Sequence, residues 1–116
     1  MVLDQSPQLD GVFHALADPT RRSMLRSLAG GQRKIGDLAA PHRMSFAAAS
    51  KHVRVLERAG LVTREVQGRT HLCRLQAAPL AEADSWLSFY SRLWSDQLDA
   101  LDAVLRAEAS TPEETR

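Results

Sequence analysis

Hydrophobic residues near the start of the chain recur every three or four positions, which is the spacing of one face of a helix. Two such stripes run through residues 9–17 and 19–29, and Asp18 and Pro19 stand between them. Proline disfavours a helical residue before it but fits the first turn of a helix, and an aspartate can cap that turn. The pattern therefore predicts two short consecutive helices, the second ended by a Gly-Gly pair.

The strongest helical pattern in the middle of the chain covers residues 45–59. Ala49, Val53 and Leu56 form its hydrophobic stripe, and small or basic residues occupy most of the other positions. Ser45 is a typical N-cap, and the glycine after residue 59 is typical of a helix end. We therefore expect an amphipathic helix with a basic outer side.

Only short elements fit between these helices. Residues 32–34 predict a brief extended segment, and residues 36–40 predict a short helix that Pro41 ends. Residues 42–44 then form a turn. The pattern thus predicts a short helix joined by a tight turn to the amphipathic helix.

The period of the pattern changes after residue 60. Residues 61–66 and 69–75 favour β-strands, and Gln67 and Gly68 between them are typical of a turn. These two runs predict a β-hairpin. Because an isolated hairpin is barely stable in water, we expect it to pack on the helices.

The longest helical pattern runs over residues 80–107, after a linker at 76–79. We expect residues 9–107 to form one domain, preceded by a flexible arm at 1–8 and followed by a polar tail at 108–116. The predicted fold is mainly α, with five helices and a small β-hairpin.

The distribution of charge adds a function to this fold. The net charge is only +1, but 12 of the 15 Lys and Arg residues and 3 of the 14 Asp and Glu residues lie at positions 19–74, which gives this segment a charge of +9 and the remainder −8. A basic block of this kind is typical of a protein that contacts nucleic acid. A solvated basic surface is the alternative.

Composition argues against several other classes. The N-terminal sequence lacks the regions of a secretory signal, and no apolar run approaches the ~18 residues of a membrane span, so we expect a soluble cytoplasmic protein without membrane contact. The single cysteine, Cys73, allows no intramolecular disulfide. We expect it to be buried on a strand, with a redox thiol as the alternative. No catalytic set or phosphate-binding loop is present, so we do not expect an enzyme.

The order of elements predicts a winged helix-turn-helix. In that fold one helix enters the major groove of DNA and the hairpin, or wing, reaches the flanking backbone. Ala47 would keep the helix at 45–59 slim enough to enter, and Lys51 and Arg54 would supply cations. A DNA-binding regulator is therefore the first hypothesis, and a winged helix that binds proteins is the alternative.

Three segments, FHALADPTRRSMLRSLAGG, SFAAASKHVRVLERAGLV and GRTHLCRL, resemble the ArsR-type (ArsR/SmtB) family of small dimeric bacterial repressors. The resemblance covers residues 9–75. It implies a winged-helix homodimer that binds an imperfect palindrome in double-stranded DNA and usually represses transcription. It also implies DNA contacts from the recognition helix and the wing, namely from Ser45, Phe46, Ala47, Ser50, Lys51, His52, Arg54, Arg64, Gly68 and Arg69.

Some of these roles stay open at the level of sequence. Phe46 could cover the turn as a core residue, and His52 could pack or contact a phosphate instead of a base. Arg21 and Arg22 could reach phosphate. Because arginine is unfavourable near a helix N-terminus, either phosphate or Asp18 should compensate them.

The sequence departs from the metal-sensing members of this family. Their sites use a Cys-x-Cys pair in the third helix or Asp, His and Glu residues across the last helix. Here the third helix has no cysteine, and the last one has Asp96, Asp99 and Asp102 but no histidine. We therefore expect no metal and no cofactor. The inducing signal stays open between a small molecule, a partner protein, oxidation of Cys73 and the repressor concentration itself.

The last helix predicts the assembly. Its hydrophobic stripe would form a large apolar patch on a monomer, so we expect a homodimer through the first and last helices. Packing of the stripe on its own domain is the alternative. The predicted interface consists of Leu9, Phe13, Leu87, Tyr90, Trp94, Leu98, Leu101 and Leu105.

Overall fold

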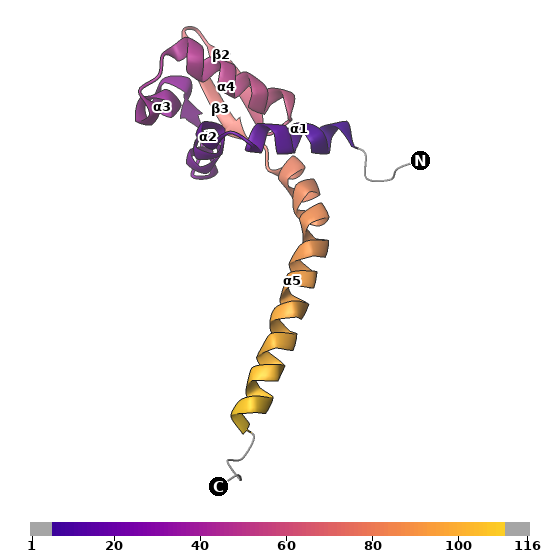
Figure 1. Ribbon diagram of the computed structural model, residues 1–116. Coiled ribbons are helices and arrows are strands. Elements are labelled where there is room, and N and C mark those ends of the chain that lie inside the picture. The colour runs from indigo at the N-terminus through magenta and orange to yellow at the C-terminus, as the bar shows by residue number, and fades with distance from the viewer. Residues whose placement is uncertain (1–5, 111–116) are drawn as a thin grey trace. The chain divides into compact units, whose positions relative to one another are not determined.

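The computed structural model describes residues 6–110 of the chain. It divides into two compact units, Met1–Ala83 and Asp84–Arg116, and each is described by itself. The described elements are α1 (Pro7–Leu16), α2 (Pro19–Ala29), β1 (Arg33–Lys34), α3 (Ile35–Ala39), the short 3-10 helix η1 (Ala40–His42), α4 (Phe46–Arg58), β2 (Val62–Gln67), β3 (Thr70–Leu75) and α5 (Ala78–Ser110). All except β1 and η1 are labelled in Figure 1.

Side-chain caps set the starts of the first two helices. The Ser6 hydroxyl accepts a hydrogen bond from the Leu9 amide over 3.1 Å, and Pro7 occupies the first turn. Helix α1 therefore begins two residues before the predicted position, because Ser6 and Pro7 form a cap and first-turn pair. The predicted flexible arm at 1–8 is thus wrong in its last residues, and residues 1–5 lie outside the described part. As predicted, Asp18 caps α2 by accepting from the Arg21 amide over 3.0 Å.

The turn before α4 is tight. Helix α3 gives way to η1 at Ala40, and Arg43 then takes a left-handed conformation with φ 53°. The Ser45 hydroxyl caps α4 by accepting from the Ala48 amide over 3.1 Å. At the other end, Gly60 has φ 78° while its amide and the next one donate to carbonyls of the last turn. This left-handed position is one that glycine adopts with little strain, so Gly60 ends α4 as predicted.

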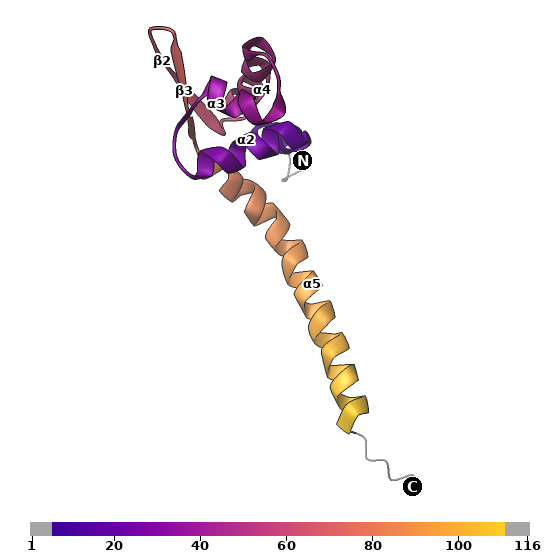
Figure 2. The ribbon, with the colours of Figure 1, turned by 90° about the vertical axis from the view of Figure 1, so that its left-hand side faces the viewer.

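The predicted hairpin is part of a three-stranded sheet. Its strand order is β1-β3-β2, and both pairs are antiparallel. The predicted extended segment at 32–34 is β1, in which Arg33 lies opposite Cys73 and Lys34 opposite Leu72. Figure 2 shows the β2–β3 hairpin on one side of α2, α3 and α4, with its turn projecting beyond these helices.

The core of the first unit forms between the helices and the sheet. The predicted stripe of α4, Ala49, Val53 and Leu56, is fully buried. It packs in one cluster with residues of α1, α2, α3 and the strands, including Leu9 and Cys73. Leu9 is 7% exposed and belongs to this core. The prediction that Leu9 lies in the dimer interface is therefore not supported, because its side chain is covered within the chain itself.

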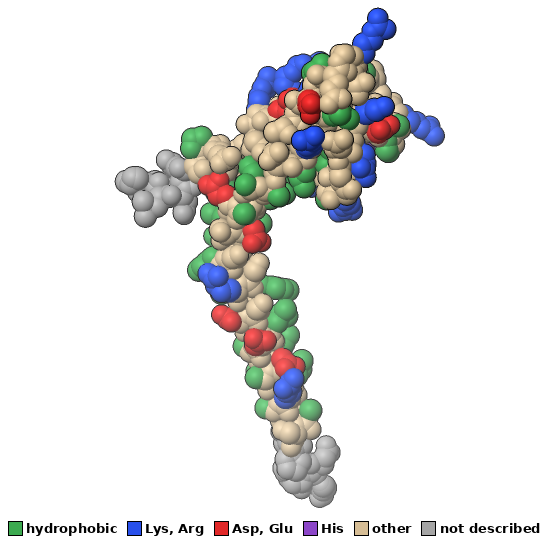
Figure 3. Space-filling model, turned by 180° about the vertical axis from the view of Figure 1, so that it is seen from behind, with side chains coloured by type: hydrophobic (Ala, Val, Ile, Leu, Met, Phe, Trp, Pro, Cys, Tyr) green, Lys and Arg blue, Asp and Glu red, His purple; other side chains and the backbone are tan. Residues whose placement is uncertain are grey.

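The second unit is helical over its described residues. Helix α5 begins at Ala78, so the predicted linker at 76–79 is shorter, and it continues to Ser110, beyond the predicted end at 107. The boundary between the units falls inside this helix and inside the single domain expected over 9–107. Residues 111–116 lie outside the described part. Figure 3 shows hydrophobic side chains beside acidic ones along this unit. The large hydrophobic residues that stay exposed are Trp86, Leu87, Phe89, Tyr90, Leu93, Trp94, Leu98, Leu101, Val104 and Leu105.

Candidate nucleic-acid interface

Helix α4 has two sides of opposite character. Its hydrophobic stripe is buried in the core, whereas Ala47, Lys51 and Arg54 are exposed. Spacings of three and four residues place these three side chains on one side of the helix. We call them the outer face of α4. It combines a small residue near the helix start with two cations, as the sequence predicted.

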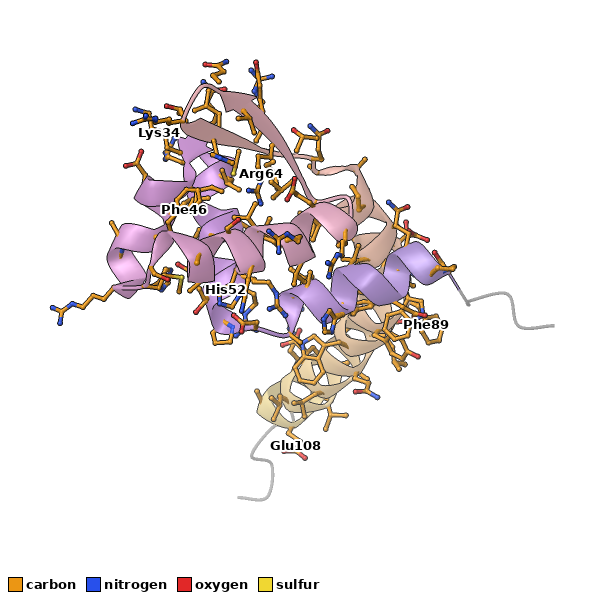
Figure 4. The ribbon with its side chains drawn as sticks, turned by 90° about the horizontal axis from the view of Figure 1, so that it is seen from above. Lys34, Phe46, His52, Arg64, Phe89 and Glu108 are labelled. Carbon is orange, nitrogen blue, oxygen red and sulfur yellow. The ribbon has the colours of Figure 1, made fainter. Side chains whose placement is uncertain are left out.

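Phe46 lies at the start of α4 and is neither a core residue nor free. Its side chain is 50% exposed. Its ring meets the edge of His71 on β3, with 5.3 Å between ring centroids and an angle of 73° between ring planes. Figure 4 shows Phe46 at the start of α4 on the side of the hairpin. The aromatic contact leaves half of the Phe46 ring open for an apolar contact with a ligand.

A shallow hollow of about 240 Å³ lies beside Phe46. Two cations that come from distant parts of the sequence border it, Lys34 of β1 and Arg69 of the hairpin turn. Sequence reasoning did not single out Lys34, because only the pairing of β1 with β3 brings it here. The lining residues are Lys34, Ile35, Gly36, Asp37, Phe46, Arg69, Thr70 and His71.

The turn of the hairpin is exposed, as a DNA-contacting wing requires. Gly68 has φ 64° at this turn, and both Gly68 and Arg69 are exposed. Arg43, in the turn before α4, is a further exposed cation that sequence reasoning did not single out. In the sequence only its place in the basic segment at 19–74 pointed to Arg43.

Ser50 and Arg64 do not face outward, contrary to the prediction for both. Ser50 is 7% exposed and accepts a hydrogen bond at Oγ from Arg64 Nη1 over 3.1 Å. The Arg64 side chain is 12% exposed and pairs with Glu57 over 2.9 Å. Figure 4 shows Arg64 between the hairpin and α4. These side chains bind one another inside the protein, so the hydroxyl of Ser50 and the charge of Arg64 are engaged within the chain.

The arginines at the start of α2 both donate to backbone carbonyls of α1, Arg21 from a largely covered side chain and Arg22 from an exposed one. Arg21 donates to the carbonyl oxygens of Ala15 and His14 over 2.9 and 3.0 Å, and Arg22 donates to that of Leu16 over 2.7 Å. They satisfy carbonyls at the end of α1, where cations are favoured. These contacts engage both arginines within the protein, and the phosphate contact considered for them stays a prediction.

His52 belongs to the same region as Arg21. It is half-buried on α4, and its Nδ1 atom lies 3.4 Å from Arg21 Nη1. Figure 4 shows His52 on the side of α4 away from the hairpin. The half-buried side chain agrees with packing, one of the two alternatives left open for His52, while its contact with DNA stays a prediction.

The remaining groups with possible chemistry are few. Burial raises the pKa of the Cys73 thiol, more than the nearby Arg64 charge lowers it. Its side chain is fully buried. Among residues 6–110, no group of three or more His, Cys, Asp or Glu side chains is placed to hold a metal ion. No helix in the described part is long and apolar enough to cross a membrane.

Comparison with known proteins gives a consistent family. Residues 18–64 match the model described as bacterial regulatory protein, arsR family. The transcriptional repressor SdpR of Bacillus subtilis is 30% identical over 79 residues, which are 68% of this chain and 88% of that protein.

Solved structures agree with this match. A crystal structure of an ArsR family transcriptional regulator has a TM-score of 0.71 and 38% identity, over 78% of this chain and 95% of that one. The solution structure of a homodimeric winged helix-turn-helix DNA-binding domain from Mycobacterium bovis, a possible ArsR-family regulator, has a TM-score of 0.58 and 25% identity, over 79% and 94% of the two chains.

Proposed function

Because the chain belongs to the ArsR family of bacterial regulatory proteins, we propose that this DNA-binding transcription regulator is a repressor that binds a palindromic operator as a homodimer. Repression is supported by the similarity to SdpR, which is a transcriptional repressor. We also propose that the protein acts by binding alone, without catalysis, in the cytoplasm, where a bacterial chromosome lies.

The observation that carries this proposal is the division of α4 into a buried and an exposed side. The buried stripe attaches the helix to the core, so its position does not depend on DNA. The outer face, Ala47, Lys51 and Arg54, is exposed. A slim, cationic helix surface fits the major groove, which is wide enough for one α-helix. We propose that this surface reads the operator.

The wing and the turn would contribute cations beside the recognition helix. Arg69 is exposed at the hairpin turn and Arg43 at the turn before α4. Phosphate contacts from such residues position a protein on DNA without reading its sequence. We propose that both residues contact the backbone on either side of the major groove.

The exposed stripe of the second unit supports the homodimer. Ten large hydrophobic residues between Trp86 and Leu105 are 39–62% exposed. A surface of this kind is unusual on a monomer. The similar domain from M. bovis is a homodimer. In a two-fold dimer the recognition helices would meet successive major grooves, roughly 34–36 Å apart, which matches a palindromic operator.

We propose that regulation does not depend on a metal. The metal sites of this family use cysteines in the third helix or histidines in the last one, and this chain has neither ligand at those places. The buried Cys73, with its raised pKa, also gives little support to a thiol switch. Under this proposal the effector that regulates DNA binding is a small molecule or a partner protein.

The direct test is selection of bound fragments from a genomic DNA pool. We expect one enriched palindromic sequence, bound with an affinity that falls steeply with salt. Arg54→Ala should weaken binding and reduce the salt slope by about 1. Arg26→Ala is the matched control, because it removes the same charge from an exposed position of α2. Failure to enrich any DNA, or equal effects of both variants, would contradict the proposal.

A further inference from the structure

We propose that Arg64 is a positioning residue that sets the wing against the recognition helix, so that DNA affinity depends on its ion pair with Glu57 although neither residue touches DNA. This inference rests on the proposed function, in which both α4 and the wing contact the operator. It concerns four residues, Ser50, Glu57, Arg64 and His71, which we call the Arg64 cluster.

The contacts of the cluster join two strands to one helix. Arg64 comes from β2, and its Nη2 atom donates to Glu57 Oε1 over 2.9 Å and lies 3.4 Å from the Ser50 carbonyl oxygen. Its Nη1 atom donates to Ser50 Oγ over 3.1 Å and lies 3.3 Å from Nδ1 of His71 on β3. Since arginine only donates, the contact with His71 is a hydrogen bond in the tautomer whose Nδ1 accepts.

The cluster follows almost the whole length of α4. Glu57 is in the last turn of the helix, Ser50 is in the middle, and Phe46 in the first turn contacts His71. A single guanidinium therefore connects the wing to the middle and the end of α4, and to its beginning through His71. Planar arginine with several donors suits this geometry, whereas lysine presents a compact charge.

Beyond this point one strand of the hairpin is exposed and the other is not. Past the pair of Arg64 and Cys73, residues 65–69 are all exposed, and Val66 is 57% exposed. Residues 70–72 of β3 are half-buried, with Leu72 opposite Lys34 of β1 and the ring of His71 against Phe46. The turn that carries Arg69 is therefore attached through the start of β3 and through the Arg64 cluster, to which His71 belongs, and the direction of Arg69 depends on both.

An outward role for Arg64 fits the structure less well. Turning this side chain toward DNA would break its ion pair and leave Glu57, 30% exposed, without its charge partner near a polyanion. The Arg64 Nε atom is buried without a hydrogen-bond partner among the described residues. The guanidinium thus has its polar groups directed into the protein, as a positioning role requires.

The two roles predict opposite signs for one substitution. If Arg64 touched DNA, the Glu57→Gln substitution would release the Arg64 charge from its ion pair and strengthen operator binding. Under the positioning role, Glu57→Gln weakens operator binding by about fivefold, because the wing loses its fixed attachment. Glu65→Gln is the matched control: it removes the same charge from an exposed residue of β2, and it should leave binding unchanged or strengthen it. Equal or stronger binding by the Glu57→Gln variant would overturn the inference.

Coupling to the wing turn separates positioning from general stability. Arg69→Ala should weaken binding by about fivefold in the original protein and by less than about twofold in a Glu57→Gln background, since a displaced wing no longer reaches DNA. Additive losses, or no loss from Arg69→Ala alone, would contradict the inference. Binding by the unmodified protein, measured in the same series, keeps this outcome distinct from failure of the proposed function.

Arg64→Lys supplies a variant that retains the charge. A phosphate contact tolerates lysine, whereas the four-way contact of the cluster does not. We expect operator binding to fall by about fivefold in samples whose thermal unfolding is first shown to be cooperative. Full binding by a folded Arg64→Lys variant would overturn the positioning role.

Discussion

Arg21 donates a hydrogen bond from Nε to the carbonyl oxygen of Ala15 over 2.9 Å, which joins the beginning of α2 to the end of α1. The same side chain is 11% exposed and also contacts Asp18. Arg21→Ala should lower the free energy of unfolding by about 2 kcal/mol, because it leaves carbonyls without their charged donor. Arg26→Ala, on the exposed side of the same helix, should change it by less than about 0.5 kcal/mol. Urea unfolding measures both, and equal effects would contradict this role.

The cap of α2 makes part of the stability depend on pH. Burial alone would raise the pKa of Asp18, but the hydrogen bond from the Arg21 amide and the Arg21 charge outweigh it and hold the pKa below its ordinary value of 3.8. A carboxyl with a lowered folded-state pKa stabilises the protein above its unfolded-state pKa, and this contribution is lost as pH falls through the folded-state pKa.

Two substitutions of Asp18 therefore separate the cap from the charge. Asp18→Ala should cost about 1 kcal/mol at neutral pH through loss of the cap. Asp18→Asn retains a capping oxygen, so it should cost less, and the difference from the original protein should disappear as the pH falls through the lowered folded-state pKa of Asp18. Urea unfolding at neutral and acidic pH tests this. If the difference in free energy of unfolding between Asp18→Asn and the original protein grew as the pH fell, the predicted effect of the Asp18 charge would be contradicted.

The exposed stripe of the second unit should control assembly. Trp94→Glu places a charge at a 62% exposed hydrophobic position and should convert the dimer to a monomer. Tight operator binding should be lost with it. Arg92→Glu is the control, because helical spacing puts residue 92 on the polar side of the same helix. Light scattering gives the mass, and a Trp94→Glu variant that remained dimeric would show that the stripe is not the interface.

Cys73 should be chemically inert in the folded protein. Its side chain is fully buried, and burial raises the pKa of its thiol, so the reactive thiolate is scarce. We expect a thiol reagent to label Cys73 only at the rate of unfolding. The labelling rate is measured from the absorbance of the chromophore that a chromogenic reagent releases. Operator binding should be unchanged after mild oxidation. Rapid labelling, together with loss of DNA binding on oxidation, would instead support a redox-responsive regulator.

The sequence predicted those parts of the fold that depend on local pattern. Ala49, Val53 and Leu56 are buried because their spacing matches a helix, and Ser45 and Asp18 act as caps because capping involves neighbouring residues. The predicted hairpin is also confirmed, because its strands and turn follow from a local pattern of residues. Its third strand was only partly foreseen, since two residues at 33–34 show no recognisable alternation.

The candidate site was predicted less completely than the fold. The predictions for its residues fail where a side chain contacts a residue that is distant in the sequence. Ser50 lies on a polar position of α4, and nothing local shows that Arg64, fourteen residues later, covers it. Arg21 likewise has the charge of a phosphate contact but is engaged by carbonyls of the preceding helix. Lys51 and Arg54 were easier to assign, since exposure on an amphipathic helix follows from the position of its stripe.

Because α4 is attached to the protein by residues that do not belong to its outer face, we expect the operator preference proposed for that face to be separable from folding. Ala47, Lys51 and Arg54 are exposed, whereas the stripe is buried. Ser50 of the Arg64 cluster, three residues from Ala47 and four from Arg54, borders the outer face. Gene duplicates could therefore diverge at these three positions while retaining the same scaffold. For the same reason, a library randomised at residues 47, 51 and 54 is a suitable starting point for directing the protein to new DNA sequences.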